Sequence, residues 1–210
     1  MNNSYANNLA KFLIQSHSLK FGNFQLASGK TSRFYIDLRL IQTSPAIFHQ
    51  TIIALRNRIQ IEKFQFDTLA TIPTSGLIFT SVLSYELFKP LIYIRKESKG
   101  YGANNLIEGK LEPFQKTLLI DDVITTGQSL DHAIKNIRSN GGIIENVICI
   151  LLRGGNTTLR KFTENGITLN FLLTITQLAD ILYKNKLIDE EKKLILQKYL
   201  SFIYHKTLFL

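Results

Sequence analysis

The sequence lacks most of the features that secreted or membrane proteins need. Its 210 residues contain one cysteine, Cys149, so no internal disulfide can form, and this favours a reducing compartment. Cys149 lies in the apolar run VICILL, which indicates a buried, inert thiol rather than a nucleophile. The N-terminus has no basic segment followed by an apolar core, and Pro73 to Gly76 interrupt the uncharged run 68–85. We therefore expect a cytoplasmic protein that does not contact a membrane.

Linkers, long charge runs and metal-ligand spacings are also missing. No Pro/Gly/Ser-rich or charged stretch divides the chain, so residues 1–210 are expected to form a single domain. The net charge of +9 could favour the binding of either nucleic acid or a polyphosphate substrate. Because no run of five like charges occurs, we expect no nucleic-acid partner. No direct metal site is expected, since metal-ligand spacing is absent among His17, His49, His132 and His205.

The stretch TLLIDDVITTGQSL, residues 117–130, carries the most chemistry in the sequence. A strand-like run, 117–120, leads into Asp121 and Asp122, and a hydroxyl-rich turn then precedes apolar residues at helical spacing. This turn, 125–129, would lie at a helix N-terminus, where backbone N–H groups and the helix dipole favour phosphate. The two carboxylates could accept hydrogen bonds from vicinal ribose hydroxyls at the carboxyl end of a strand. Helix capping, the alternative, explains one acid but not two.

A second group of charged residues follows an expected short strand, 91–94. Arg95, Lys96 and Lys99 precede glycines and asparagines, a composition that is typical of a mobile loop. Cations on such a loop would stabilise the charge that develops as pyrophosphate leaves a sugar, and loop closure would exclude water. A charged surface hairpin is the alternative. A third loop, 74–76, follows the strand expected near residue 66, but its residues alone indicate little, because any tight turn could contain them.

Hydrophobic patterning elsewhere predicts alternating helices and strands, as an α/β protein with a doubly wound sheet requires. Residues 21–40 suggest either two strands or a strand and a turn. The further elements that we expect are helices at 5–16, 46–60 and 77–88, strands starting near 66 and within 143–152, a strand and a helix within 162–182, and a final amphipathic helix at 189–203.

The motif LLIDDVITTG resembles the phosphoribosyl pyrophosphate (PRPP) motif of type I phosphoribosyltransferases. YIDLR at 35–39 and RKESKGYG at 95–102, followed by LIEG, resemble motifs of the orotate phosphoribosyltransferases within that group. The resemblance implies a central, mostly parallel sheet flanked by helices, with a small hood built from the N-terminal segment. It also implies transfer of the phosphoribosyl group of PRPP to orotate, with Mg²⁺ bound through PRPP, in a homodimer that shares loop 95–110 across its interface.

The resemblance also assigns roles to individual residues, and it implies that the loop 74–76 holds pyrophosphate. Lys99, Asp121 and Asp122 would be catalytic. Orotate would be bound by Tyr35, Ile36, Thr125 and Arg153. PRPP would be bound by Thr74, Ser75, Arg95, Lys96, Lys99, Tyr101, Asp121, Asp122, Val123, Ile124, Thr125, Thr126, Gly127, Gln128 and Ser129.

Three positions depart from the pattern of the family. Ala27 stands where many members have lysine, which leaves Lys30 or Arg33 as substitutes by position, and Arg33 itself stands where many have proline. Leu152 replaces the usual acid before Arg153. These departures could weaken the binding of orotate or PRPP. Because the chain ends at residue 210, we expect any decarboxylase to be a separate protein.

Two other classes of protein share the PRPP motif. A phosphoribosyltransferase for another base would not be expected to share RKESKGYG and YIDLR. A PRPP-sensing regulator that binds RNA would keep the turn 125–129 (the phosphate turn). It would lose the loop that carries Arg95, Lys96 and Lys99 (the lysine loop). Both orotate motifs and the lysine loop are present here. The sequence therefore favours an orotate-specific enzyme.

Overall fold

The computed structural model describes residues 3–25, 31–97 and 106–204. Four residues discussed above, Ala27, Lys30, Lys99 and Tyr101, lie outside these ranges. The chain divides into two compact units, one formed by residues 1–51 with 173–210 and the other by residues 52–172. The single domain expected for residues 1–210 stays a prediction.

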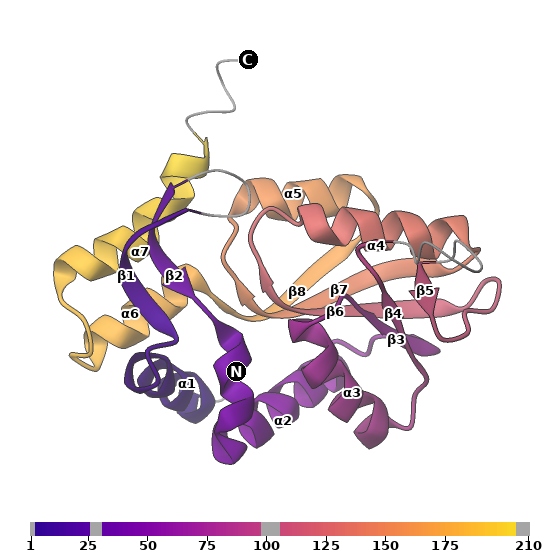
Figure 1. The fold of residues 1–210 in the computed structure, drawn as a ribbon, viewed down its shortest axis with the longest axis horizontal. Coiled ribbons are helices and arrows are strands. Elements are labelled where there is room, and N and C mark those ends of the chain that lie inside the picture. The colour runs from indigo at the N-terminus through magenta and orange to yellow at the C-terminus, as the bar shows by residue number, and fades with distance from the viewer. Residues whose placement is uncertain (1–2, 26–30, 98–105, 205–210) are drawn as a thin grey trace. The chain divides into compact units, whose positions relative to one another are not determined.

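The larger unit is organised around a six-stranded sheet with the strand order β5-β4-β3-β6-β7-β8 (Figure 1). Strand β4 pairs in parallel with β3, β3 with β6, and β6 with β7, whereas the short β5 is antiparallel to β4. This confirms the mostly parallel sheet expected from the sequence. The strands are β3 (Thr68–Thr71), β4 (Leu91–Ile94), β5 (Ile107–Glu108), β6 (Lys116–Ile124), β7 (Ile143–Leu152) and β8 (Thr168–Thr174).

Helices cover both faces of this sheet (Figure 1). Helices α4 (Gln128–Ser139) and α5 (Asn156–Glu164) lie on one face, and α3 (Ser75–Leu87) lies on the other. Helix α2 (Pro45–Ile61) precedes β3, as its periodicity predicted. Because parallel strands are buried on both faces, they read as near-continuous apolar runs, which is how β6 and β7 were recognised.

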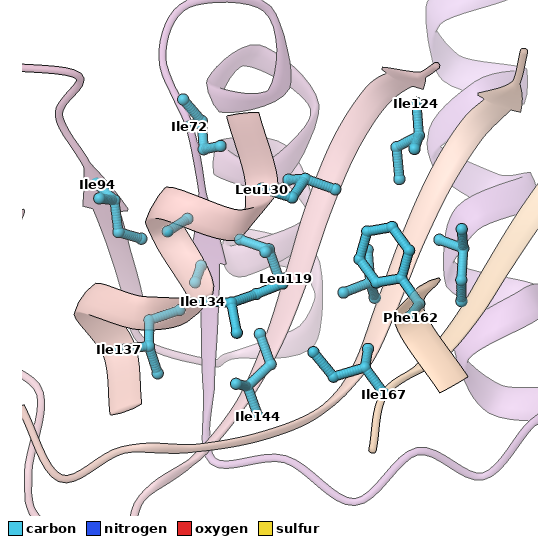
Figure 2. Packing of buried hydrophobic residues seen from close by; sticks show 14 of the residues in the cluster. Ile72, Ile94, Leu119, Ile124, Leu130, Ile134, Ile137, Ile144, Phe162 and Ile167 are labelled. Atoms are coloured by element: carbon cyan, nitrogen blue, oxygen red, sulfur yellow. The ribbon is translucent and has the colours of Figure 1, made fainter. Parts of the chain in front are cut away.

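The core of the larger unit fills the space between the sheet and the helices α4 and α5 (Figure 2). Leu130, Ile134 and Ile137 project from α4 at helical spacing, and Phe162 of α5 belongs to the same cluster as Leu119 of β6 (Figure 2). Full burial of each such side chain contributes about 1.5–3 kcal/mol. The cluster includes Ile72, which follows β3, and Ile124 and Leu130, which flank the turn after β6. Packing of these side chains therefore fixes the positions of both loops.

The smaller unit combines both ends of the chain. Strands β1 (Leu19–Gln25) and β2 (Thr31–Ile36) form an antiparallel pair, so the two-strand alternative is the correct one. Helix α1 packs against α6, and α7 contacts β2. The N-terminal segment from which a small hood was expected lies in this unit, which also contains the C-terminal helices, and α1 and α6 pack against one another. The helices of this unit are α1 (Asn3–Gln15), the 3-10 turn η1 (Leu38–Thr43), α6 (Ile175–Lys184) and α7 (Glu190–Tyr204).

None of the helices that the structure describes is both long enough and apolar enough to span a bilayer. The expected cytoplasmic location stays a prediction.

Candidate active site

The two adjacent acids lie on β6 where this strand runs past the end of β3. The last residue pair between β3 and β6 is Thr71 with Ile120, whereas β6 remains paired with β7 as far as Ile124. The strand predicted for 117–120 therefore ended four residues too early, because pairing with β7 continues through the acids. Asp121 and Asp122 are both partly exposed. Because β3 ends at Thr71, the segment of β6 that carries the two acids lies beside the loop that follows β3.

That loop, residues 72–75, brings the N-terminus of α3 against the acids. The hydroxyl of Ser75 donates a hydrogen bond to Asp122 Oδ2 at 2.6 Å. A Cβ atom at Gly76 would lie 2.4 Å from Thr71 Oγ1 and 3.3 Å from Asp121 Oδ1, so only glycine fits between the helix and the strand. The peptide bond between Pro73 and Thr74 is cis. The structure thus places the predicted pyrophosphate loop directly beside the predicted ribose acids.

Asp121 lies in an environment that favours its neutral form. Burial raises the pKa of its carboxyl group well above the ordinary value, and the negative charge of Asp122 raises the pKa further. The backbone N–H of Asp122, which donates to Asp121 Oδ1 at 3.0 Å, and the cation of Lys96 both act in the opposite direction. A ligand that brings positive charge to this carboxyl group would therefore favour its ionised form.

Cys149 is the neighbour of Asp121 on β7. Its side chain is fully buried and forms no disulfide, as the apolar run around it predicted. Burial raises the pKa of the Cys149 thiol well above its ordinary value, and the charge of Asp121 adds to this shift. The thiol is therefore neutral at physiological pH and is not a nucleophile.

The turn between β6 and α4 has the geometry of a phosphate site. Gly127 adopts a φ of 72° immediately before the first residue of α4, and a Cβ atom there would lie 2.6 Å from the Phe162 ring. Thr126, Gln128 and Ser129 are exposed around this helix N-terminus. The first N–H groups of a helix have no partner within the helix and point toward any anion placed there.

Residues just before α5 and in its first turn hold the β6–α4 turn in place. The hydroxyl of Thr158 donates a 2.8 Å hydrogen bond to the carbonyl oxygen of Thr125, and a Cβ atom at Gly154 would lie 2.1 Å from the same oxygen. The backbone N–H groups of Arg153 and Gly154 donate to Ile124 O at 2.8 and 3.0 Å. Sequence reasoning missed the roles of Gly154 and Thr158, although two glycines directly after a buried strand were a usable signal.

The lysine loop begins and ends on a β-hairpin of this chain. The backbone N–H of Arg95 donates to Leu106 O at 2.9 Å, and Arg95 Nε lies 3.0 Å from Glu108 Oε1. Strand β5, which the sequence did not predict, places residues 107–108 in the sheet, where Ile107 is buried. The loop expected at 95–110 is therefore shorter at its C-terminal end. Lys96 is exposed at its start.

The base-binding residues expected from the sequence fall in both units. Arg153 directly follows β7 in the larger unit and is 5% exposed. Tyr35 and Ile36 lie on β2 of the smaller unit, where successive side chains point to opposite faces. Ile36 is buried, and Tyr35 is partly exposed and accepts a 3.3 Å hydrogen bond from Arg39 Nη2. Their contacts with orotate stay predictions.

Within the larger unit, three predicted groups meet at the carboxyl ends of adjacent parallel strands. These ends carry the pyrophosphate loop after β3, the cations after β4, and the acids with the phosphate turn on and after β6. Ligands of open α/β sheets bind at this edge. The mostly parallel sheet, with two acids and a threonine- and glycine-rich turn on and after its central strand β6, has the architecture of a phosphoribosyltransferase of type I.

Similarity to known proteins narrows the class of phosphoribosyltransferase to which the chain belongs. The family model described as "Phosphoribosyl transferase domain" matches residues 41–164. The orotate phosphoribosyltransferase of Staphylothermus marinus is 35% identical over 192 residues, which cover 90% of this chain and 91% of that protein. A crystal structure of orotate phosphoribosyltransferase from Aeropyrum pernix aligns with a TM-score of 0.73 at 29% identity, over 86% of this chain and 99% of that one. The structure of Leishmania donovani UMP synthase aligns with a TM-score of 0.81 at 30% identity, over 93% of this chain and 42% of that one. The chain belongs to the phosphoribosyltransferase family, among the orotate phosphoribosyltransferases, as its motifs predicted.

Proposed function

We propose that this chain transfers the 5-phosphoribosyl group of PRPP to orotate, giving orotidine 5-phosphate and pyrophosphate in de novo pyrimidine biosynthesis. The observation that carries this proposal is the junction of Asp121 and Asp122 with the phosphate turn 125–129 on one continuous strand and turn. One ligand that bears both a vicinal diol and a terminal phosphate matches this arrangement.

The sugar phosphate would be held by the β6–α4 segment. The 5-phosphate would bind the N–H groups and hydroxyls of the turn 125–129, while the carboxylates of Asp121 and Asp122 accept hydrogen bonds from the ribose hydroxyls. Ser75 orients Asp122 through its 2.6 Å hydrogen bond. These contacts would leave the anomeric carbon and its diphosphate directed toward the loop 72–75 and the cations after β4.

In the chemical step a ring nitrogen of orotate forms a bond to the anomeric carbon and gives up its proton to pyrophosphate or to water, while the bond to the pyrophosphate oxygen breaks. The electron pair of the broken bond leaves with pyrophosphate, so negative charge grows on the leaving group. Lys96 and Lys99 would stabilise that charge more in the transition state than in the ground state. The guanidinium of Arg95 already neighbours Glu108, so its contribution would be smaller.

The residues present fit a Mg²⁺ ion that arrives with PRPP. Among the described residues there is no group of three or more His, Cys, Asp or Glu side chains placed to hold a metal. Mg²⁺ is usually bound by one or two carboxylates at most, with substrate phosphates and waters as its other ligands, and here Asp121 and Asp122 would accept hydrogen bonds from the metal-bound sugar hydroxyls rather than bind the ion directly. When bound, Mg²⁺ would supply positive charge to the diphosphate.

Recognition of orotate would use a cation and an aromatic side chain. Orotate carries a carboxylate and two carbonyl groups, for which the planar guanidinium of Arg153 is a suitable donor. The low exposure of Arg153 places its charge in a medium of reduced dielectric, where a charge-assisted hydrogen bond is strengthened. Tyr35 would form a wall for the flat ring, Ile36 would hold this part of β2 from its opposite, buried face, and Thr125 would add a polar contact.

We further propose a homodimer in which the lysine loop serves the site of the neighbouring subunit. The loop leaves the sheet after β4 and returns to it at β5 of the same chain, so only the residues between these strands can extend toward a partner. Lys99 is the residue that would reach the partner's PRPP.

The proposed reaction is tested by incubating the purified chain with orotate, PRPP and Mg²⁺. The loss of orotate and the appearance of orotidine 5-phosphate and pyrophosphate would be followed by absorbance and chromatography. We expect turnover with orotate and not with adenine, hypoxanthine or uracil. Binding of PRPP without conversion of any base would contradict the proposal and would indicate a PRPP-sensing protein instead.

A further inference from the structure

A second pocket lies at the opposite end of the strands from the catalytic loops. It has a volume of about 330 Å³ and is lined by the segment 62–65, which follows α2, and by residues near the starts of β6, β7 and β8. Lys116, the first residue of β6, belongs to this lining. Asp121 is five residues further along the same strand, which at about 3.3 Å per residue places it roughly 16 Å away. The pocket is therefore separate from the candidate active site.

Asn170 of β8 offers a buried and unused hydrogen-bond donor to this pocket. The residue is 8% exposed, and its Nδ2 atom is buried without a hydrogen-bond partner in the part of the chain that the structure describes. Its neighbours Leu169 and Phe171 pack into the core beneath α4 and α5, so Asn170 points to the opposite face of the sheet. A buried donor without a partner costs about 1–3 kcal/mol. An acceptor on a bound ligand would remove that cost.

Asn146 of β7 provides a second amide on the same face. Its neighbour Val147 belongs to the core beneath α4 and α5, so alternation along the strand directs Asn146 to the face of Asn170. Both asparagines line the pocket. An amide side chain offers two N–H donors and one carbonyl acceptor. Two such groups in the lining of one pocket match a ligand edge that carries both acceptors and donors.

The charges around the pocket cancel. Lys63 and Lys116 are matched by Glu62 and Glu145, with Lys116 Nζ lying 3.8 Å from Glu145 Oε2. Phosphate would meet two carboxylates here, in contrast to the helix N-terminus at the phosphate turn. The lining therefore suits an uncharged ligand. Phe64, which is partly buried in the same wall, adds an aromatic side chain that can pack against a flat ring.

We infer that this pocket is a binding site for an uncharged nucleobase, free or as a nucleoside, held by the amides of Asn146 and Asn170 and by the ring of Phe64. A nucleobase combines a flat face with an edge of adjacent donors and acceptors, and its size suits the volume of this pocket. The inference does not depend on the proposed reaction, because none of these residues takes part in it.

The test is a calorimetric titration of the purified chain with uridine, cytidine, adenosine and guanosine. We expect at least one nucleoside to bind with a Kd below about 1 mM. Asn170→Leu should weaken that binding about tenfold or more, since one ligand acceptor loses its donor. This change replaces an unsatisfied amide by an apolar side chain of similar size, so the fold should be retained. Asn146→Ala provides a second variant in case Asn170→Leu does not fold.

The matched control is Asn57→Ala, which removes an exposed asparagine amide from α2, outside the pocket. It should leave nucleoside binding unchanged. Inorganic phosphate, titrated in the same way, should not compete with the nucleoside. If no nucleoside binds, or if binding is the same in wild type, Asn170→Leu and Asn146→Ala, the inference is wrong. The titration needs no turnover, so its result is independent of the orotate assay.

Discussion

The hydroxyl of Ser75 and the carboxylate of Asp122 are joined by a 2.6 Å hydrogen bond between residues 47 positions apart in the chain. This bond connects the N-terminus of α3 to β6, and so connects the loop expected to hold pyrophosphate to the acids expected to hold ribose. The two halves of the proposed PRPP site are therefore not independent. A substitution in either half should therefore also change how the other half binds PRPP.

Removal of this bond should lower activity more than stability. For Ser75→Ala we expect kcat/KM for PRPP to fall about tenfold or more, because a hydrogen bond to a charged group contributes about 1.5–3 kcal/mol. Steady-state kinetics and thermal unfolding would be measured together. The matched control is Ser81→Ala on the same helix, whose hydroxyl donates to Leu77 O and lies away from the acids. Equal effects of the two changes on kcat/KM would show that the Ser75 bond does not orient Asp122.

Support of the phosphate turn can be tested at Gly154. A Cβ atom there would lie 2.1 Å from Thr125 O, so Gly154→Ala must displace the turn. We expect a loss of about 1–3 kcal/mol in the free energy of unfolding and an increased KM for PRPP. In the control Gly166→Ala the new Cβ atom meets nothing within 4 Å, but φ is +69°, so only backbone strain of about 1–2 kcal/mol applies. An unchanged KM in Gly154→Ala would contradict the supporting role.

The acid pair should make stability depend on pH. Because burial and Asp122 raise the pKa of Asp121 in the folded state, the folded chain binds more protons than the unfolded chain between the ordinary and the raised pKa. Stability from this group therefore falls as the pH rises through that interval. Asp121→Asn removes the effect, so this variant should be more stable than wild type at pH 7, with a difference that shrinks toward about pH 4. Denaturant unfolding at several pH values would measure it.

The Asp121→Asn variant should at the same time lose PRPP affinity, because its carboxylate is expected to accept hydrogen bonds from ribose. A calorimetric titration with PRPP and Mg²⁺ checks this second effect. A variant that is less stable than wild type at every pH would show that the Asp121 carboxylate stabilises the fold.

Sharing of the lysine loop can be tested by mixing two inactive chains. One chain carries Lys99→Ala, and the other carries Asp121→Asn with Asp122→Asn. After dissociation and random reassociation about half of the dimers are mixed, and one of the two sites in each has both its acids and its lysine. We expect about a quarter of wild-type activity. If mixed dimers form and remain inactive, the loop acts within its own chain.

The sequence was most informative where structure depends on local patterns. The helix α2 and the strands β4 and β7 were predicted close to their observed bounds, and a helix was expected after the turn where α4 occurs, because the apolar residues repeat at helical spacing or form continuous buried runs. The chemistry of the site was also readable, since two acids followed by a threonine- and glycine-rich turn occur within one short stretch.

Elsewhere the outcome depended on partners distant in the chain. The extension of β6 through Asp121 and Asp122 depends on pairing with β7, and the two-residue strand β5 exists because Ile107 and Glu108 pair with β4. Neither strand boundary is marked by composition. Hydrophobic patterns locate the strand cores, whereas the partner strand decides where pairing stops.

The sequence by itself determined the kind of chemistry and the order of the elements, because charge, hydroxyl content, glycine position and hydrophobic period are properties of the chain. Only the tertiary structure decided that Ser75 reaches Asp122 and that Gly154 and Thr158 support Thr125. It also decided that α6 joins the unit of α1, and that Asn170 is left with a buried, unused donor. The physical reason is that these contacts depend on strand register and close packing between segments that are far apart in the chain.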